Sequence, residues 1–177
     1  VYHIRPYVTA QSTWSRHSLN VTLSADFALF DTYDNQNYTD YFLDASGRVD
    51  VKTNSFFSYN LNYMDLHQDR SNRDSIQGFE PTRYHTFGGS FGYDHTFNRL
   101  SLGASYSPQW LDYDNSVSLT GEVIDNQDQD RQGDIWSFNA GYQFRTNMQA
   151  FVRYSPYKVK YDEDINSGYD RSGKGYS

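Results

Sequence analysis

The segment SLNVTLSADFALFD, residues 18–31, alternates strictly between apolar and polar residues. The apolar positions are Leu19, Val21, Leu23, Ala25, Phe27 and Leu29. Because successive side chains of a strand point to opposite faces, this period of two predicts one long β-strand with unlike faces. These apolar positions would span about 33 Å of strand, or roughly 25 Å across a layer at a tilt near 40°.

The same alternation recurs along the chain and predicts an all-β protein with no helix. The predicted strands cover residues 1–13, 18–32, 38–52, 55–68, 83–97, 99–114, 134–146 and 148–162, with a ninth starting near Tyr169. Soluble sandwich strands average about five or six residues, so most of these strands are unusually long.

Short and long connections alternate between these strands. Short turns are predicted near residues 15–17, 53–54, 98 and 146–147, and long polar loops at 33–37, 69–82, 115–133 and 163–168. All long loops therefore belong to one end of the sheet. This asymmetry is typical of up-and-down outer-membrane barrels, which have short periplasmic turns and longer outer loops.

The composition agrees with a folded chain that is poor in aliphatic residues. Only 37% of the 177 residues are hydrophobic, but 17 Tyr, 12 Phe and 3 Trp are too many for a disordered chain. The absence of cysteine excludes disulfides, zinc–thiolate sites and thiol nucleophiles. The net charge of −7 argues against a nucleic-acid partner.

Strand length and connection pattern together predict an antiparallel, up-and-down transmembrane β-barrel with its apolar face toward lipid and its polar face toward a lumen. Backbone groups in lipid require a closed sheet. The alternative is a soluble barrel or sandwich whose apolar face is packed shut as a core. The many small polar residues on the opposite face favour a lumen wall.

Strict parity predicts a set of polar, lumen-lining side chains. They are Asn20, Asp26, Asp44, Arg48, Asp50, Asn60, Asn62, Asp94, Asn139, Gln143 and Arg145. A charged side chain in contact with lipid costs free energy, whereas one that meets water or an opposite charge does not. The position of the charged residues on this face therefore supports its assignment to the lumen. They could form a polar track for a sugar chain, or simply pair within the wall, as Arg48 could with a neighbouring aspartate.

Both YSP triplets, residues 106–108 and 154–156, place a proline inside a predicted strand. Proline lacks the N–H that a ladder bond needs, so we expect a β-bulge at each. A bulge at Pro156 would also explain why Val159 and Tyr161 follow the opposite parity.

Catalytic and metal-binding patterns are weak. No serine is evidently paired with His95, and we expect no enzyme activity, no cofactor and no metal site. The acidic segments 125–130 and 162–166 carry oxygen ligands that could bind calcium, but neither matches an EF-hand loop.

The stretches EPTRY (80–84), FNRLSL (97–102) and GYDRSGKGY (168–176) resemble the putative β-barrel porin family of outer-membrane proteins that accompany exopolysaccharide export. The resemblance covers nearly the whole chain. In family members the last motif leads into further strands, and such barrels have about sixteen or more. The resemblance thus implies that residues 1–177 are one segment of a larger barrel, incomplete at both ends, although an eight-stranded barrel filled by side chains remains an alternative.

The resemblance further implies a porin, or an export channel or anchor, for exopolysaccharide in the outer membrane of Gram-negative bacteria. The implied partners are outer-membrane lipid and lipopolysaccharide, a periplasmic polysaccharide export protein and polysaccharide itself. A structural or adhesive surface barrel without a channel is the competing function.

Overall fold

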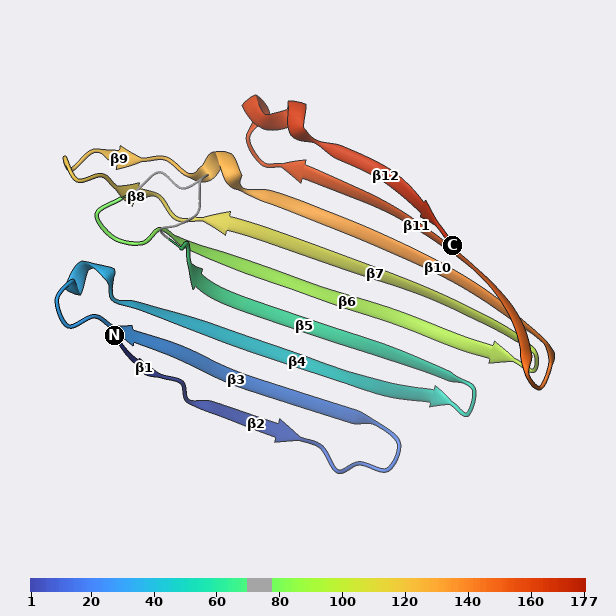
Figure 1. Ribbon diagram of the computed structural model, residues 1–177. Coiled ribbons are helices and arrows are strands. Elements are labelled where there is room, and N and C mark those ends of the chain that lie inside the picture. Colours follow the sequence, from blue (N-terminus) through green and yellow to red (C-terminus); the bar gives the residue numbers. More distant parts are fainter. Residues whose placement is uncertain (70–77) are drawn as a thin grey trace.

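The computed structural model describes residues 1–69 and 78–177, and their architecture is one large antiparallel β-sheet (Figure 1). Its strands are β1 (Tyr2–Ile4), β2 (Tyr7–Gln11), β3 (Ser18–Leu29), β4 (Tyr38–Lys52), β5 (Ser55–His67), β6 (Arg83–Phe97), β7 (Leu100–Tyr113), β10 (Arg131–Arg145), β11 (Met148–Tyr161) and β12 (Arg171–Tyr176). A separate hairpin pairs β8 (Ser116–Val117) with β9 (Val123–Ile124), and short 3-10 turns lie at Asp34–Gln36, Gln127–Gln129 and Asp164–Tyr169. The all-β antiparallel fold is confirmed.

Within the described ranges, no helix is long and apolar enough to cross a membrane.

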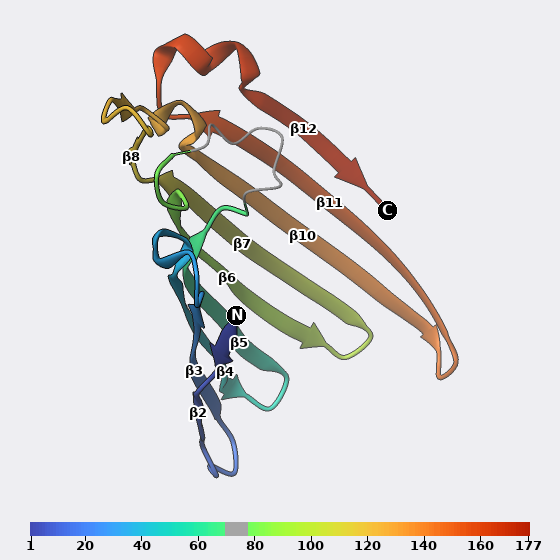
Figure 2. The same ribbon diagram turned by 60° about the vertical axis from the view of Figure 1, so that its left-hand side comes forward.

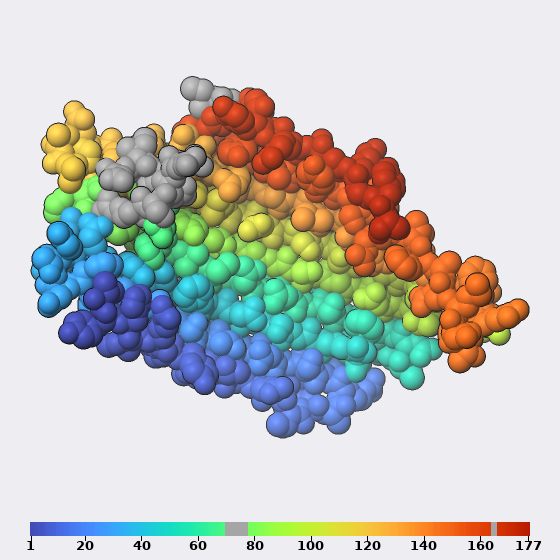
Figure 3. Space-filling model, in the orientation of Figure 1, coloured from blue at the N-terminus to red at the C-terminus, as the bar shows by residue number. Residues whose placement is uncertain are grey.

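Each main strand pairs with its neighbours in sequence, from β1 and β2 at one edge to β12 at the other. Figure 1 shows the long connections gathered at one end and the short turns at the other, as predicted. The sheet is strongly curved and open, with β2 and β12 at separate edges (Figure 2). In the space-filling view the strands form a continuous wall whose colours run in sequence order (Figure 3).

Strand boundaries agree closely with the prediction for β4 and β6, whereas β3 ends at Leu29 rather than at residue 32 and two further strands differ. The predicted strand 1–13 is divided into β1 and β2, and β10 begins at Arg131 rather than at residue 134. The predicted long loop 115–133 also contains the β8–β9 hairpin and a 3-10 turn. Most of the predicted loop 69–82 lies outside the described residues.

The predicted bulges at the YSP prolines are wrong. Pairing of β10 with β11 keeps one register from Ile135↔Tyr157 to Phe138↔Tyr154, across Pro156. The β6–β7 register is likewise unchanged across Pro108. Each proline leaves a gap in one ladder, where its missing N–H would have bonded, but adds no residue to the strand. Pro6 separates β1 from β2 in the same way, with one register against β3.

Val159 and Tyr161 therefore follow the opposite parity without a bulge. Val159 pairs with Gly133 and Tyr161 with Arg131, which belong to the polar face of β10. On the other face of this part of β11 lie Lys158 and Lys160, partners of Asp134 and Gln132. The apolar face of β11 thus ends before these charged residues, because the strand extends past its apolar band.

The large apolar side chains cover one face of the sheet and are not packed beneath any other element. Leu23 is 53% exposed and Phe138 is 47% exposed, and Ala28 is the one fully covered hydrophobic residue in the described part of the chain. Many residues of the opposite, polar face are half-buried among one another. A soluble sandwich or barrel would show the reverse, with this apolar face closed as its core.

The position of the apolar band shifts from strand to strand. Leu23 lies near the middle of the band on β3, and its cross-strand row continues through Leu43, Tyr63, Phe87 and Trp110 to Gln132. On β10 the apolar band begins only at Trp136, so the row has left the band by the time it reaches that strand. This stagger corresponds to strands tilted by roughly 40° relative to the band, the tilt of membrane barrels.

Candidate functional site: the polar face of the sheet

The strand register places ten of the eleven predicted polar residues on the same face of the sheet. One cross-strand row on this face runs through Asp50, Phe56, Asp94, Gly103, Asn139 and Arg153. Cross-strand partners share a face, so the remaining predicted residues can be placed from their own partners. The predicted parity of β3 to β10 therefore holds as far as Gln143, after which the register of β10 against β11 shifts.

Four of the predicted residues gather toward the short-turn end. Arg48 donates from Nε to Oδ1 of Asp50 at 2.7 Å, and its guanidinium lies 3.7 Å from the centre of the Phe56 ring. Asp94 is the next residue in the row beyond Phe56, and Asn139 accepts a 2.8 Å bond from Nε of Arg153. The pairing expected for Arg48 within the wall is present, which orients its charge along the sheet surface.

A second group lies nearer the middle of the face. Asn60 donates from Nδ2 to Oδ2 of Asp44 at 3.1 Å. The side chain of Asn62 extends over Gly88, where an added Cβ would lie 2.9 Å from its Oδ1. Glycine at this position therefore allows the amide to lie across β6.

The other predicted residues are dispersed. Asn20 pairs in register with Ser46, and Asp26 lies near the long loops, where it accepts bonds from His3 and Arg5, each at 3.0 Å. Gln143 donates to the carbonyl of Thr146 in the β10–β11 turn. Arg145 follows a register shift at the same turn and pairs with Met148, so its predicted place on the polar face is wrong. The other ten residues line one face but do not form one compact site.

Sequence parity also points to polar-face residues that were not singled out. One row contains Ser18, Arg48, Ser58, Gly92, Ser105, Ser137, Ser155 and Gly175, and the next contains Asn20, Ser46, Asn60, Ser90, Ser107, Ile135, Tyr157 and Gly173. The members of these rows on β3 to β10 could have been found from the two-residue alternation of polar and apolar residues alone. The β11 part was missed because Phe151 and the expected bulge obscured its parity.

A third row continues this pattern through Thr22, Asp44, Asn62, Gly88, Gln109, Gly133, Val159 and Arg171. Charged side chains in these three rows are limited to Asp44, Arg48 and Arg171, and the first two have polar partners within the wall. Hydroxyl, amide and glycine positions dominate. This part of the polar face is thus suited to uncharged, hydrogen-bonding molecules rather than to ions.

Near the long loops, ion pairs connect neighbouring strands. His67 binds Asp40 through its Nδ1 at 2.9 Å and through its backbone N–H at 3.0 Å, while its ring stacks on Tyr38 with 3.5 Å between centres. Arg83 donates to Asp65 at 2.5 Å and to the carbonyl of Thr39 at 3.3 Å. These contacts join β4, β5 and β6 at the rim that carries the loops.

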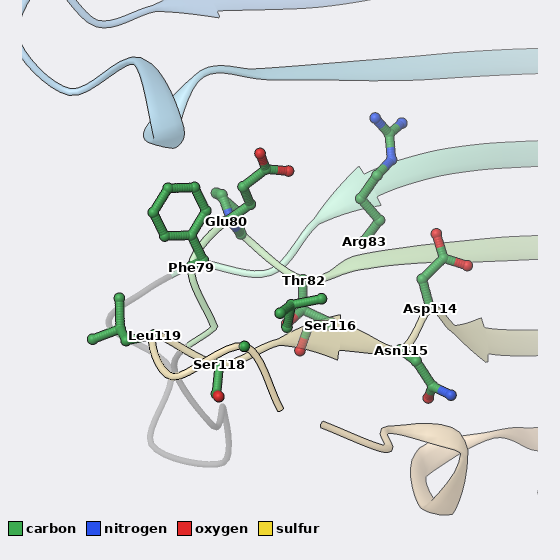
Figure 4. A pocket seen from close by; sticks show the side chains of 12 residues that line it. Phe79, Glu80, Thr82, Arg83, Asp114, Asn115, Ser116, Ser118 and Leu119 are labelled. Atoms are coloured by element: carbon green, nitrogen blue, oxygen red, sulfur yellow. The ribbon is translucent and has the colours of Figure 1, made fainter. Parts of the chain in front are cut away.

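A pocket of about 610 Å³ lies at the same end, between the segment before β6 and the β8–β9 hairpin (Figure 4). The backbone N–H of Phe79 donates to the carbonyl of Val117 at 2.6 Å, which holds the two walls together. Figure 4 shows Phe79 and Leu119 on one side, with Ser116 and Asn115 toward the sheet. Its mixed lining provides apolar and hydrogen-bonding surfaces to a ligand outside the barrel wall.

Asp130 connects the long loop before β10 to two strands. Its Oδ1 accepts the backbone N–H of Tyr113 at 2.6 Å, and its carbonyl accepts that of Asp162 at 3.1 Å. The pKa of this carboxyl is raised to about 6, mainly because the residue is only 9% exposed. The hydrogen bond from Tyr113 acts to lower the pKa, and the nearby carboxylates Asp112 and Asp162 act to raise it.

The raised pKa of Asp130 predicts a pH-dependent stability difference from Asp130→Asn. The folded protein holds the proton on the Asp130 carboxyl more tightly than the unfolded chain does. The protonated carboxyl therefore contributes fully to the free energy of unfolding below about pH 4. This contribution decreases between about pH 4 and pH 6 and is lost above about pH 6. We expect the wild-type free energy of unfolding, relative to the variant, to fall by about 2 kcal/mol across this window, since neighbouring carboxylates can share the proton.

Urea titrations of both proteins in detergent at pH 4, 5, 6 and 7 measure this difference. The amide introduced by Asp130→Asn would keep an acceptor for the backbone N–H of Tyr113 while removing the titration. A difference between the two proteins that does not change with pH would contradict the assignment.

The described ranges place the candidate catalytic and calcium-binding groups as follows. His95 lies opposite Ser55, but the Ser55 hydroxyl makes no hydrogen bond within the described structure, and the His95 ring packs 3.9 Å from that of Phe97. Asp125 accepts a bond from the backbone of Gln127. No three described histidines or carboxylates are close enough together to hold a metal ion.

Comparison with known proteins identifies the family. The family model described as putative beta-barrel porin 2 matches residues 1–177, the whole chain. No curated protein and no solved structure matches. The whole-chain match accords with the long tilted strands, the exposed apolar face and the polar opposite face, and a porin family implies an outer-membrane location. The chain therefore belongs to the putative beta-barrel porin 2 family.

Proposed function

We propose that this chain forms an arc of a channel wall in the bacterial outer membrane, and that uncharged polar solutes pass along its polar face. The observation that carries this proposal is the composition of the three central rows, in which serine, asparagine, glutamine and glycine predominate. A wall of hydroxyls and amides offers many weak hydrogen bonds and little electrostatic selection. Members of a porin family serve passage rather than catalysis, which supports a non-enzymatic role.

The directions of the edge strands support a wider barrel than the nine strand positions of this sheet. Alternate strands of an antiparallel sheet reverse direction, so β2 and β12 run the same way, from the long-loop end toward the short turns (Figure 1). These two edges cannot pair antiparallel with each other. Closing a wholly antiparallel barrel therefore requires an odd number of further strands, and a wider barrel encloses an open channel.

Polysaccharide is the cargo that this wall fits best. A neutral sugar chain carries no charge, and its hydroxyls match the donors and acceptors of the polar face. As part of the proposal, the channel works with a periplasmic polysaccharide export protein in exopolysaccharide secretion by Gram-negative bacteria, and its outer surface contacts lipid and lipopolysaccharide.

Conductance of the purified full-length protein in planar lipid bilayers tests the channel. We expect stable open steps with weak preference between cations and anions, because few unpaired charges line the central rows. A folded protein that produces no conductance would overturn the proposal. It would favour the second candidate, a structural or adhesive surface barrel, to which the 610 Å³ pocket at the loop end would contribute a ligand site.

A further inference from the structure

A depression of about 320 Å³ lies on the polar face between β5 and β11, toward the long-loop end. The side chains that line it from this face belong to Asn62, Ser107, Gln109, Ile135, Tyr157 and Val159, and none is charged. Asp134 and Lys158 also border it, but their register places their side chains on the other face of the sheet. Its size is at the lower end of the roughly 300 to 1,000 Å³ range of small-molecule sites.

Glycines shape this depression. Gly133 lies between Gln109 and Val159 in the row, and an added Cβ there would meet no atom within 4 Å. On one side, the Asn62 amide lies over Gly88. No neighbouring side chain covers Gly133, so the missing side chain at this position leaves an open hollow in the wall.

Tyr157 forms a flat aromatic surface at the other side of the hollow. Its Cε1, Cζ and Oη would lie 2.5 to 2.7 Å from a Cβ at Gly173, its partner on β12, so the ring lies directly on that glycine. Tyr157 is nevertheless 44% exposed. One side of the ring thus packs on the backbone at Gly173, and the ring remains accessible from the polar face of the sheet. Aromatic residues in other β-sheets cover strand glycines in the same way.

We propose that this depression is a binding subsite for an uncharged oligosaccharide, with one sugar ring stacked on Tyr157 and the hydroxyls of neighbouring sugar units bonded to the amides of Gln109 and Asn62. A pyranose has apolar C–H faces and a rim of hydroxyls, which are both donors and acceptors. An exposed aromatic ring beside side-chain amides matches both surfaces, and an uncharged lining offers no partner to an ionised sugar. The assignment rests on the proposed function in that the polar face must contact water.

Two types of variant distinguish the subsite from the rest of the wall. Gly133→Leu fills the hollow where the backbone has space, and Tyr157→Leu removes the stacking surface without adding volume. Gly175→Leu is the matched control, because it adds the same side chain on the polar face of β12, outside the depression, where a Cβ meets only ordinary contacts at 3.6 and 3.8 Å.

Isothermal titration of the full-length protein in detergent micelles with maltohexaose measures binding without requiring transport. We expect Gly133→Leu and Tyr157→Leu each to weaken binding by about tenfold or more, and Gly175→Leu to leave it within about twofold. Hexagalacturonate, a charged hexamer, is expected to bind at least about tenfold more weakly than maltohexaose.

Absence of maltohexaose binding to the wild-type protein would overturn the subsite, as would equal affinity in the Gly133→Leu and Tyr157→Leu variants or equal binding of the charged hexamer. Conductance of the same preparations separates this outcome from failure of the channel. A protein that conducts but does not bind maltohexaose would retain the proposed function and lose the subsite. Variant-sensitive binding without conductance would retain the subsite and remove the channel.

Discussion

Replacing Ala45 by arginine is expected to reduce the free energy of unfolding in lipid by about 2 to 4 kcal/mol, the cost of a basic side chain near the middle of a barrel's lipid face. Ala45 lies on the apolar face of β4, in register with Val21 of β3 and Leu61 of β5. No protein element covers this face, so the new side chain would meet hydrocarbon rather than a steric barrier. The loss would therefore measure lipid contact itself.

Ser46→Arg is the matched control for Ala45→Arg. The two positions are adjacent on β4, but Ser46 lies on the polar face between Asn20 and Asn60. An arginine there would meet polar neighbours and water, and we expect a loss of less than about 1 kcal/mol. Urea unfolding of both variants in phospholipid vesicles, followed by tryptophan fluorescence, measures the difference. Equal losses at the two positions would show that the faces are not chemically distinct.

Gly47→Val is expected to destabilise the protein by about 2 to 3 kcal/mol through overpacking. A Cβ at Gly47 would lie 2.5 Å from the backbone oxygen of Ser18 and 2.5 Å from the hydroxyl of Tyr59, which covers this glycine on the apolar face. The Ser18 carbonyl belongs to β3, which pairs with β4 along its whole length. Relief of the clash would therefore require a shift of the backbone ladder rather than of one side chain.

Gly133→Val provides the corresponding control for stability. It makes the same substitution within a strand of the same sheet, at a position where the added Cβ meets nothing within 4 Å. The expected change is within about 0.5 kcal/mol, because valine fits strands well and no contact is displaced. If Gly133→Val were as destabilising as Gly47→Val, the loss would reflect the removal of glycine and not the close approach of Ser18 and Tyr59.

The strands and their faces could be predicted from the sequence because period two is a local property. Residues 38–52 and 83–97 were identified with the observed boundaries of β4 and β6, and all predicted polar residues but Arg145 share one face. The two-residue strands β8 and β9 could not be found in this way, because they are too short to show any period.

Contacts between strands depend on the pairing register and on where the hydrogen-bond ladder is interrupted. The sequence of a single strand specifies neither of these. The pairing of Arg48 with Asp50 was foreseeable from their shared parity, but the stacking of Arg48 on Phe56 depends on how β4 pairs with β5. The bulge at Pro156 was predicted because a strand proline must lose a ladder bond. A gap in one ladder satisfies that requirement with no change of register, and sequence alone does not distinguish the two outcomes.

For the aromatic residues too, part of the prediction is confirmed and part is wrong. Their positions near strand ends predict that Trp110, Tyr113 and Trp136 belong to the aromatic girdles that membrane barrels carry at the lipid–water interface. Trp110 and Trp136 lie on the apolar face, as this role requires. Tyr113 was assigned to the same girdle, but it lies on the polar face and stacks on Tyr84 with 5.2 Å between ring centres. Its position near a strand end suggested the interface, whereas its parity on β7 determines its face.

Spin labels along one strand test most directly whether the apolar face touches lipid and the polar face touches water. The chain has no cysteine, so single cysteines at Leu43, Asp44, Ala45 and Ser46 can each be labelled without background. With the protein in lipid vesicles, we predict that labels at 43 and 45 collide mainly with dissolved oxygen, and that labels at 44 and 46 collide mainly with a water-soluble nickel complex. Equal accessibility at all four sites, or the reverse alternation, would contradict the account.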